Sequence, residues 1–278
     1  MTQPCLNFRF LAGLLFLGSI TVALAGPKTS DEPTNGEEAA AQKAKAEAET
    51  DAQYQALVLT LSPEEQAWEK TLQSELGSFY LPIHQREKVA GKSNAWDFVQ
   101  DDPELPRVLL IGDSISRAYT QTVRKELAGK ANVHRAPANC GPTATGLKKL
   151  DVWLGDGKWD VIHFNFGIHD RATPLDEYRQ RLELLVTRMK ETGAKLVWAS
   201  STPIPDLPEK KWTASSIVER NAVAAEVMKE NSVAVNDLFS AITPLVDELQ
   251  NPNDCHYQEP GNQFLGKRVA EFLDQQLK

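Results

Sequence analysis

Hydrophobic residues follow two different spacings in the C-terminal two thirds of the chain. Short apolar runs, such as residues 108–111, end at a glycine and are typical of buried strands. Longer stretches, such as residues 174–192, place apolar side chains three and four positions apart, which is typical of amphipathic helices. Because the two patterns alternate, the sequence predicts a three-layer α/β/α fold in which helices cover both faces of a parallel sheet.

Five stretches carry the strand pattern, and helical patterns separate most of them. The expected strands are 108–111, 133–135, 160–166, 195–200 and 233–235. The expected helices are one that stops near Gly129, those over 174–192 and 215–231, and two that close the chain, the last over 259–277. Ligands of such sheets bind beyond the carboxyl ends of the strands. Chemically active residues are therefore expected in the loops that follow the strands.

The first 25 residues have the pattern of an export signal. Arg9 is the only charged residue there, an apolar run follows it, and Ala23-Leu24-Ala25 is a small-x-small cleavage site. The apolar run is shorter than the roughly 20 residues that a membrane-spanning helix needs. We therefore expect a signal peptide over residues 1–25, a secreted or periplasmic protein, and no stable membrane insertion after cleavage.

The next 78 residues differ in composition from the main domain, which is expected over residues 104–278. Residues 26–60 are largely low in complexity and are expected to form a linker or a frayed helix, because they bury too little apolar surface to order themselves. Residues 61–103 are expected to form a helical extension that packs on the main domain or beside its mouth. Its first helix starts at a capping sequence, Ser62 to Glu65. Three apolar residues then share one face of that helix: Trp68, Leu72 and Leu76.

Composition and charge narrow the class of partner. Hydrophobic residues make up 41% of the chain, which is enough for an ordinary globular core. The formal net charge is −8, and the sequence has no basic stripe interleaved with aromatic residues. Binding to a phosphate backbone needs clustered Lys and Arg, so nucleic acid is not an expected partner.

The first strand runs into the sequence Gly112-Asp113-Ser114. A serine at a strand-to-helix turn presents its hydroxyl at the edge of the sheet, next to free N–H groups that stabilise an oxyanion. Asp and Ser are also preferred helix caps, so the same triplet is compatible with a purely structural turn. The strand before it favours the nucleophile hypothesis.

The loops after the second and third strands carry further polar groups. In residues 139–143, Gly141 allows the backbone N–H to approach a ligand closely, although Gly-Pro is also a common turn. In residues 165–170, His169 follows a glycine at a strand end, and Asn165 lies just before it. These side chains are candidate hydrogen-bond donors to the site of Ser114.

His256, near the C-terminus, is the candidate general base. A base needs a ring nitrogen beside the serine hydroxyl and a third group that orients the ring, and Asp254 is close in sequence. The remaining histidines lie in the extension or within strands, where structural roles are expected: His84, His134 and His163.

In this order, the four elements resemble the GDSL/SGNH hydrolase superfamily over roughly residues 106–276. Ser114 matches the nucleophile of the family, Gly141 its oxyanion glycine and His256 its catalytic histidine. Residues 167–170 stand where the family usually has Gly-x-Asn-Asp. The resemblance implies a flavodoxin-like sheet of five parallel strands.

The resemblance also implies a chemistry. Ser114 and His256 would hydrolyse carboxylic esters through an acyl-enzyme, with no metal or cofactor. The oxyanion would be held by the backbone N–H groups of Ser114 and Gly141 and by an Asn side chain. Export and an acidic chain fit a small-molecule or saccharide ester, such as a sugar acetate; the oligomeric state is left open.

The chain departs from the family pattern in two places. His169 stands where the family has its oxyanion Asn; its ring N–H is a possible donor, with Asn165 as the fallback. The acid of the family precedes its His by three residues, where this chain has Asn253. Asp254, two residues before His256, is therefore the expected orienting acid, with Asn253 as the alternative.

Cys140 adjoins Gly141 and Cys255 adjoins His256, and both loops are expected at the sheet edge around Ser114. In an oxidising compartment two such cysteines can bridge. We therefore expect a Cys140–Cys255 disulfide that holds the oxyanion loop against the loop of the base.

Two other functions compete with the esterase hypothesis. The departures at His169 and Asn253 are compatible with a non-catalytic carbohydrate-binding module on the same fold. A nucleotide-binding domain would also have alternating strands and helices, but the chain lacks both G-x-G-x-x-G after its first strand and a P-loop sequence.

Overall fold

The computed structural model describes residues 35–278, and the predicted export signal lies outside the described residues. Contacts divide the chain after Ala44, and the unit Lys45–Lys278 contains every strand and helix described here except the start of the first helix. The helices are α1 Asn35–Val58, α2 Pro63–Glu75, α3 Gly77–Val89, α4 Ser114–Glu126, α5 Thr143–Leu154, α6 Leu175–Lys190, α7 Ala214–Glu230, α8 Leu238–Ile242, α9 Val246–Leu249 and α10 Glu259–Gln276. The strands are β1 Arg107–Ile111, β2 Asn132–Arg135, β3 Val161–Phe164, β4 Lys195–Ala199 and β5 Ala234–Asn236.

The strands form one parallel sheet in the order β2-β1-β3-β4-β5. This is the flavodoxin-like order, so the predicted α/β class, the strand number and the parallel pairing are confirmed. Parallel neighbours require crossover helices, which the alternating sequence supplies. All five strands point their carboxyl ends to the same edge, where the loops with candidate site residues lie.

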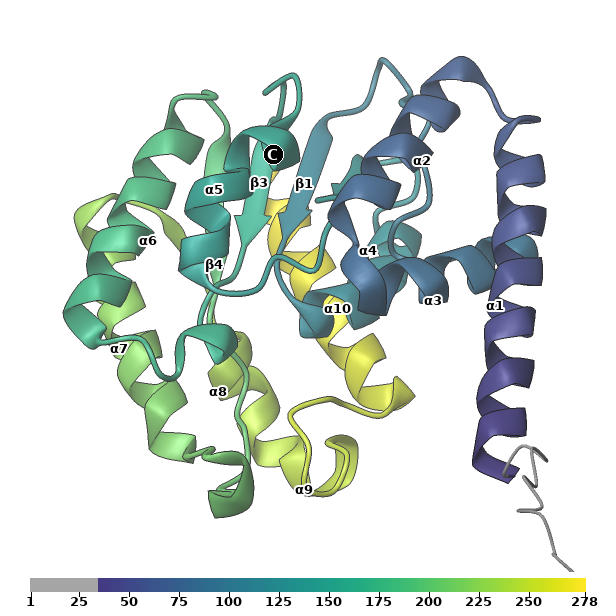
Figure 1. Cartoon of the computed structure of the whole chain (residues 1–278). Helices are drawn as coiled ribbons and strands as arrows, with labels where there is room; N and C mark the ends of the chain where they lie inside the picture. Colours follow the sequence, from purple (N-terminus) through teal and green to yellow (C-terminus); the bar gives the residue numbers. More distant parts are fainter. Residues whose placement is uncertain (1–34) are drawn as a thin grey trace, which may run out of the picture. The chain divides into compact units, whose positions relative to one another are not determined.

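Helices cover both faces of the sheet, with α5 in front of it and α10 behind it in Figure 1. On β1, Val108 and Leu110 face the core against α4 and α10, while Leu109 and Ile111 face the core against α5 and α6. Strands buried on both faces become continuous apolar runs, which is why residues 108–111 lack alternation. At Gly266 of α10, a Cβ atom would lie 2.5 Å from Thr122 Cβ of α4, so the close crossing requires glycine.

Helix α5 was not predicted from the sequence. Helix α5 follows the Gly141-Pro142 turn, and its residues Leu150 and Trp153 are buried against the sheet. Its stretch contains a glycine, Gly146, which lowers helix propensity and obscures the pattern. The glycine is needed because an added Cβ would lie 2.9 Å from a ring carbon of Phe166.

The N-terminal extension, residues 50–103, comprises the end of α1, α2, α3 and the loop that leads to β1. Its predicted capping box is confirmed: Ser62 and Glu65 exchange hydrogen bonds of 3.2 Å between side chain and backbone. The stretch expected as a linker or a frayed helix contains α1, whose Tyr54 is buried. The extension packs on the main domain, where Arg124 of α4 donates to Asn94 O at 3.1 Å.

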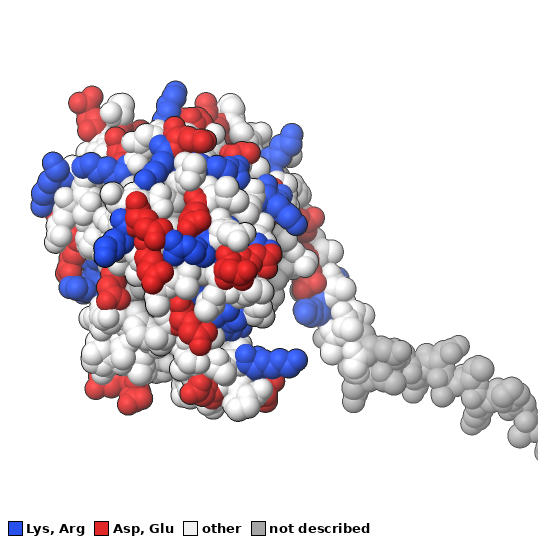
Figure 2. Space-filling view, turned by 90° about the vertical axis from the view of Figure 1, so that its left-hand side faces the viewer, with Lys and Arg blue, Asp and Glu red and all other residues white. Residues whose placement is uncertain are grey.

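Charged side chains on the face of α6 and α7 are interspersed in sign (Figure 2). Arg179 lies 2.9 Å from Glu183 and 3.2 Å from Glu226, and Arg188 pairs with Asp151. The cations of this face are therefore neutralised locally. Within residues 35–278, no helix is long and apolar enough to cross a membrane.

Candidate active site

The turn between β1 and α4 places Ser114 at the first position of a helix. Asp113 is the N-cap, and its Oδ1 accepts a hydrogen bond of 3.0 Å from the N–H of Ile115. Gly112 cannot carry a side chain, because its Cβ would lie 2.7 Å from Ser116 Oγ. The tight turn leaves the half-buried Ser114 at the carboxyl edge of the sheet, with the free N–H groups of the helix beside it.

Ser114 and His256 meet across 142 residues of sequence. The Ser114 Oγ atom lies 2.8 Å from His256 Nε2, which is within hydrogen-bond distance. On the other side of the ring, His256 Nδ1 lies 2.9 Å from Asp254 Oδ1. The three side chains have the geometry of a nucleophile, a general base and an orienting acid.

The structure places Asp254, rather than Asn253, against the ring of His256. Asn253 adopts a positive φ of 55°, and its carbonyl accepts a hydrogen bond of 2.8 Å from Lys210 Nζ. Burial acts to raise the pKa of Asp254, but the hydrogen bond and the charge of His256 outweigh it, so this pKa lies below its usual range. A carboxylate that stays ionised is suited to stabilise an imidazolium.

The loop with Gly141 is held in place by Asp170. The fully buried Asp170 accepts hydrogen bonds of 2.9 Å from Thr143 N and 2.6 Å from Thr143 Oγ1, so it caps the start of α5. Arg220 of α7 donates to the carbonyl of Asp170 at 2.8 Å. Gly141 has a positive φ of 65°, which glycine adopts without strain. The loop after β2 is therefore fixed by the loop after β3.

The two candidate side-chain donors lie differently. Asn165 Nδ2 donates to Ala199 O at 2.7 Å and to Ser201 Oγ at 3.1 Å, so its amide serves the end of β4 and is not placed as an oxyanion donor. His169 Nε2 lies 3.8 Å from Asp113 Oδ2, and its side chain is 39% exposed. His169 is thus beside the nucleophile turn and open to solvent.

Comparison with solved structures identifies the fold. The lipase/acylhydrolase from Enterococcus faecalis matches with a TM-score of 0.56 and 23% identity, over 62% of this chain and 97% of that one. The acetyl xylan esterase AlAXEase matches with a TM-score of 0.53 and 14% identity, over 60% and 99%. Axe2, an acetylxylan esterase from Geobacillus stearothermophilus, matches with a TM-score of 0.52 and 16% identity, over 60% and 93%. The chain has the SGNH hydrolase fold.

The resemblance drawn from the sequence motifs is thereby confirmed at the level of the fold. No protein-family model matches the sequence, and no curated protein matches it. The share of the SGNH structures that is covered is nearly complete, whereas about two fifths of this chain has no counterpart in them.

The predicted Cys140–Cys255 disulfide is not present in this SGNH fold: both cysteines are free and buried. Cys140 belongs to the core on the α5 and α6 side of the sheet, whereas Cys255 belongs to the core on the α4 and α10 side. The Cys255 Sγ atom lies 3.7 Å from His256 Nδ1, and Cys140 Sγ lies 3.9 Å from Ala138 O. The sequence predicted that both loops lie at the same edge of the sheet, but it did not indicate on which face of the sheet each cysteine side chain is buried.

A buried arginine under the turn that carries Ser114 was not identified from the sequence. Arg135 of β2 is 1% exposed and donates to Ser116 Oγ at 2.7 Å and to the carbonyls of Gly112 and Asp113 at 2.9 Å. Burial lowers its pKa, and within the described residues no carboxylate lies in ion-pair range of it. The only feature of the sequence that pointed to this role was a charged residue, Arg135, within a short strand expected to be buried. Arg135 fixes the backbone that carries Ser114.

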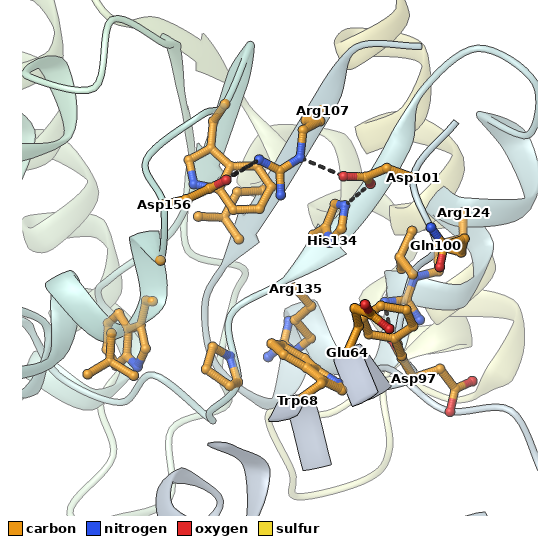
Figure 3. Close-up of a pocket in the computed structure, with 18 residues that line it drawn as sticks. Glu64, Trp68, Asp97, Gln100, Asp101, Arg107, Arg124, His134, Arg135 and Asp156 are labelled. Atoms are coloured by element: carbon orange, nitrogen blue, oxygen red, sulfur yellow. Dashed lines mark hydrogen bonds and ion pairs between the residues drawn. The ribbon is translucent and has the colours of Figure 1, made fainter. Parts of the chain in front are cut away.

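Arg135 also lines a pocket of about 380 Å³ along the outer edge of β2 (Figure 3). Trp68 of α2 lies at one end of this pocket, and Arg107, between Asp101 and Asp156, lies at the other. The lining does not include Ser114, Asp254 or His256. The pocket is therefore separate from the candidate active site.

Tyr80 of α3 was also missed, because residues of the extension gave no sign that they reach the nucleophile. Burial raises the pKa of Tyr80, and the side chains of Arg117, Asp113 and Ser114 all act on it. The extension thus brings the ring of Tyr80 to 5.6 Å from Cζ of Arg117, which follows Ser114 by one turn of α4. The SGNH structures compared above cover about 60% of the chain.

Proposed function

We propose that the protein hydrolyses carboxylic esters with Ser114 as nucleophile. The observation that carries the proposal is the linked geometry of the triad: 2.8 Å from Ser114 Oγ to His256 Nε2 and 2.9 Å from His256 Nδ1 to Asp254 Oδ1. A serine hydroxyl at its ordinary pKa is a weak nucleophile and needs such a base. The SGNH fold, shared with lipases and acetyl xylan esterases, supports the same chemistry.

In the first step, Ser114 Oγ attacks the ester carbonyl and its proton passes to His256 Nε2. The tetrahedral intermediate collapses when His256 donates that proton to the leaving alcohol oxygen, which leaves an acyl-Ser114 ester. Water then attacks the acyl group and gives its proton to His256. Collapse of the second intermediate releases the carboxylic acid and returns the proton to Ser114. Asp254 accepts from Nδ1–H throughout and stabilises the imidazolium.

The negative oxygen of both intermediates needs hydrogen-bond donors. The backbone N–H groups of Ser114 and Gly141 supply two, and His169 supplies the third through its ring N–H. Loss of one such donor typically costs about 2.7–4 kcal/mol of transition-state stabilisation. Because the side chain of His169 is exposed, it can also reach an oxyanion that forms only in the complex.

The natural substrate is proposed to be a small acyl or saccharide ester. Two of the similar structures are acetyl xylan esterases, which supports a short acyl group. The export signal over residues 1–25 is proposed from sequence alone. Sequencing the N-terminus of the protein recovered after expression in a Gram-negative host tests it, and an intact Met1 would refute cleavage.

The deciding experiment measures 4-nitrophenyl acetate hydrolysis by the parent protein, by Ser114→Ala and by Ser74→Ala, an exposed serine on α2. We expect turnover in the parent and in Ser74→Ala and a loss of roughly 10³-fold or more in Ser114→Ala. Circular dichroism checks that all three are folded. Equal rates in the parent and Ser114→Ala would refute the esterase and favour a non-catalytic carbohydrate-binding module.

A further inference from the structure

Arg117 lies one helical turn after Ser114, on the same side of α4. Residues three apart on a helix are neighbours, with Cβ atoms about 5–6 Å apart. The half-buried Arg117 makes no ion pair or hydrogen bond through its side chain within residues 35–278, and its Nε is buried without a partner. An arginine beside the nucleophile therefore has its hydrogen-bonding capacity unused.

The extension holds this guanidinium in position. The Arg117 Cζ atom lies 5.6 Å from the ring centre of Tyr80 and 5.8 Å from that of Trp96. The two rings contact each other edge to face, with centres 5.5 Å apart. Aromatic faces attract a cation and restrict its motion without using its N–H groups. Arg117 is thus oriented by ring contacts and keeps its donors for another group.

Tyr80 connects Arg117 with the reacting serine. Burial raises the pKa of Tyr80, Arg117 is the strongest opposing influence, and Asp113 and Ser114 also act on this group. Tyr80 is placed beside Arg117 by the ring contact, and Arg117 follows Ser114 by one helical turn of α4. A molecule whose carbonyl is attacked by Ser114 therefore has Arg117 as a neighbour on the same side of α4.

A second arginine lies near the same turn. Arg171 packs over the ring of Trp212 at 4.9 Å, and its side chain donates to the carbonyl of Ile168. Burial lowers the pKa of Arg171, and the nearby Cys255 and Asp113 oppose that effect. In the described residues it makes no ion pair with a carboxylate. The surface arginines of α6, such as Arg179 and Arg188, are by contrast paired with acids.

We propose that Arg117 is a carboxylate-binding subsite and that the preferred substrate is an ester that carries a negative charge. The proposal rests on the esterase function and names its substrate class. Guanidinium groups bind carboxylates through paired N–H donors, and a partly desolvated site strengthens this interaction. The charge belongs either to the acyl half or to the alcohol half of the ester, and the two are distinguished by the substrates tested.

The experiment compares kcat/KM for matched charged and neutral esters. In the first pair, 4-acetoxybenzoate carries the charge in its alcohol half, and its methyl ester is the neutral control. In the second pair, the monoanion of mono-4-nitrophenyl adipate carries the charge in its acyl half, and 4-nitrophenyl hexanoate is the neutral control. We expect the parent to prefer the charged member of one pair by about tenfold or more, as for a hydrogen bond to a charged group. The preference should shrink as the salt concentration rises.

Three variants locate the preference. Arg117→Gln should lower the ratio of charged to neutral kcat/KM by about tenfold, and Arg117→Lys should retain part of it because the charge remains. Arg268→Gln, which removes an exposed arginine of α10 that pairs with Glu271, is the matched control and should leave the ratio unchanged. Circular dichroism and melting curves check that each variant is folded.

The possible outcomes separate this inference from the esterase proposal. Hydrolysis of the neutral esters that depends on Ser114, without a preference for either charged ester, overturns the subsite and leaves the esterase intact. An equal loss on both members of each pair in Arg117→Gln assigns Arg117 to packing and also overturns it. Absence of all Ser114-dependent hydrolysis overturns both.

Discussion

Two of the His–carboxylate pairs within residues 35–278 have similar distances and very different surroundings. His256 Nδ1 lies 2.9 Å from Asp254 Oδ1, and the two side chains are 43% and 37% exposed. His84 Nε2 lies 2.7 Å from Glu69 Oε2, and both side chains are fully buried within the extension. The second ring nitrogen of His256 faces Ser114 Oγ, whereas that of His84 faces Asn94 Oδ1.

The partners of each pair explain the difference. Glu69 also accepts hydrogen bonds from Tyr54 at 2.6 Å and contacts Lys88 at 2.7 Å, so its charge is neutralised inside the protein. Burial acts to raise the pKa of Glu69, but the bonds from His84, Lys88 and Tyr54 lower it to about 2. The Asp254 carboxylate accepts from the N–H of Cys255 at 2.7 Å and lies 2.9 Å from His256 Nδ1. The buried pair stabilises the extension, and the exposed pair is available for proton transfer.

The largest effect is expected at the exposed pair. Asp254→Asn should lower kcat by about 10³–10⁴-fold, because an amide does not stabilise the imidazolium and favours the wrong tautomer of His256. Its stability should change by no more than about 1 kcal/mol, the range of exposed ion pairs. Ester hydrolysis and urea unfolding test the two parts. A small loss of activity would mean that Asp254 is not the orienting acid.

The buried pair should respond in the opposite way. Glu69→Gln leaves the cation of Lys88 without its carboxylate, and breaking a buried pair costs about 3–5 kcal/mol of unfolding free energy. Urea unfolding followed by Trp fluorescence measures this loss. The double variant Glu69→Gln with Lys88→Met should recover part of it. A loss below about 1 kcal/mol for the single variant would contradict a structural role for the buried pair.

The pH dependence of stability sharpens the comparison further. At pH 3 an unfolded Glu is largely protonated, whereas Glu69 in the folded chain, with a pKa of about 2, is not. The unfolded state then binds more protons, so stability rises with pH across this window. The contribution of Glu69 should be complete above about pH 5 and lost as the pH falls towards 2. Melting temperatures of the parent and Glu69→Gln, measured from pH 2 to 6, should converge at the acid end.

The smallest effect concerns the thiol beside the exposed pair. Burial and the nearby charge of Asp254 raise the pKa of Cys255 to about 12, so almost no thiolate exists at pH 8. Iodoacetamide should therefore leave Cys255 unmodified in the folded protein and label it after unfolding. Peptide mass spectrometry reads both states. Rapid labelling of the folded protein would show that the loop of His256 opens.

Much of the fold was predictable because it depends on local periodicity. The strands and their flanking glycines appear as short apolar runs, and the start of α2 follows from the side chains of Ser62 and Glu65. Helix α5 was missed because a packing requirement at Gly146 interrupts its pattern. A requirement of that kind is invisible until the neighbouring Phe166 is in place.

The candidate site divides in the same way. Ser114, Gly141, His256 and Asp254 were named from the sequence, since each follows a recognisable strand end or adjoins its partner. The disulfide was wrong because sequence spacing does not say which face of the sheet a side chain takes. Asn165 was unsuited as a donor because its amide is used by the end of β4.

By itself the sequence determined the class of fold, the order of the strand-end loops and the residues proposed for catalysis, because these depend on spacing along the chain. The tertiary structure alone decided that Arg135 supports the nucleophile turn and that Tyr80 and Trp96 reach Arg117. Those contacts join segments far apart in sequence. They form only when the helices and strands pack together, and a local pattern of hydrophobic and polar residues does not specify that packing.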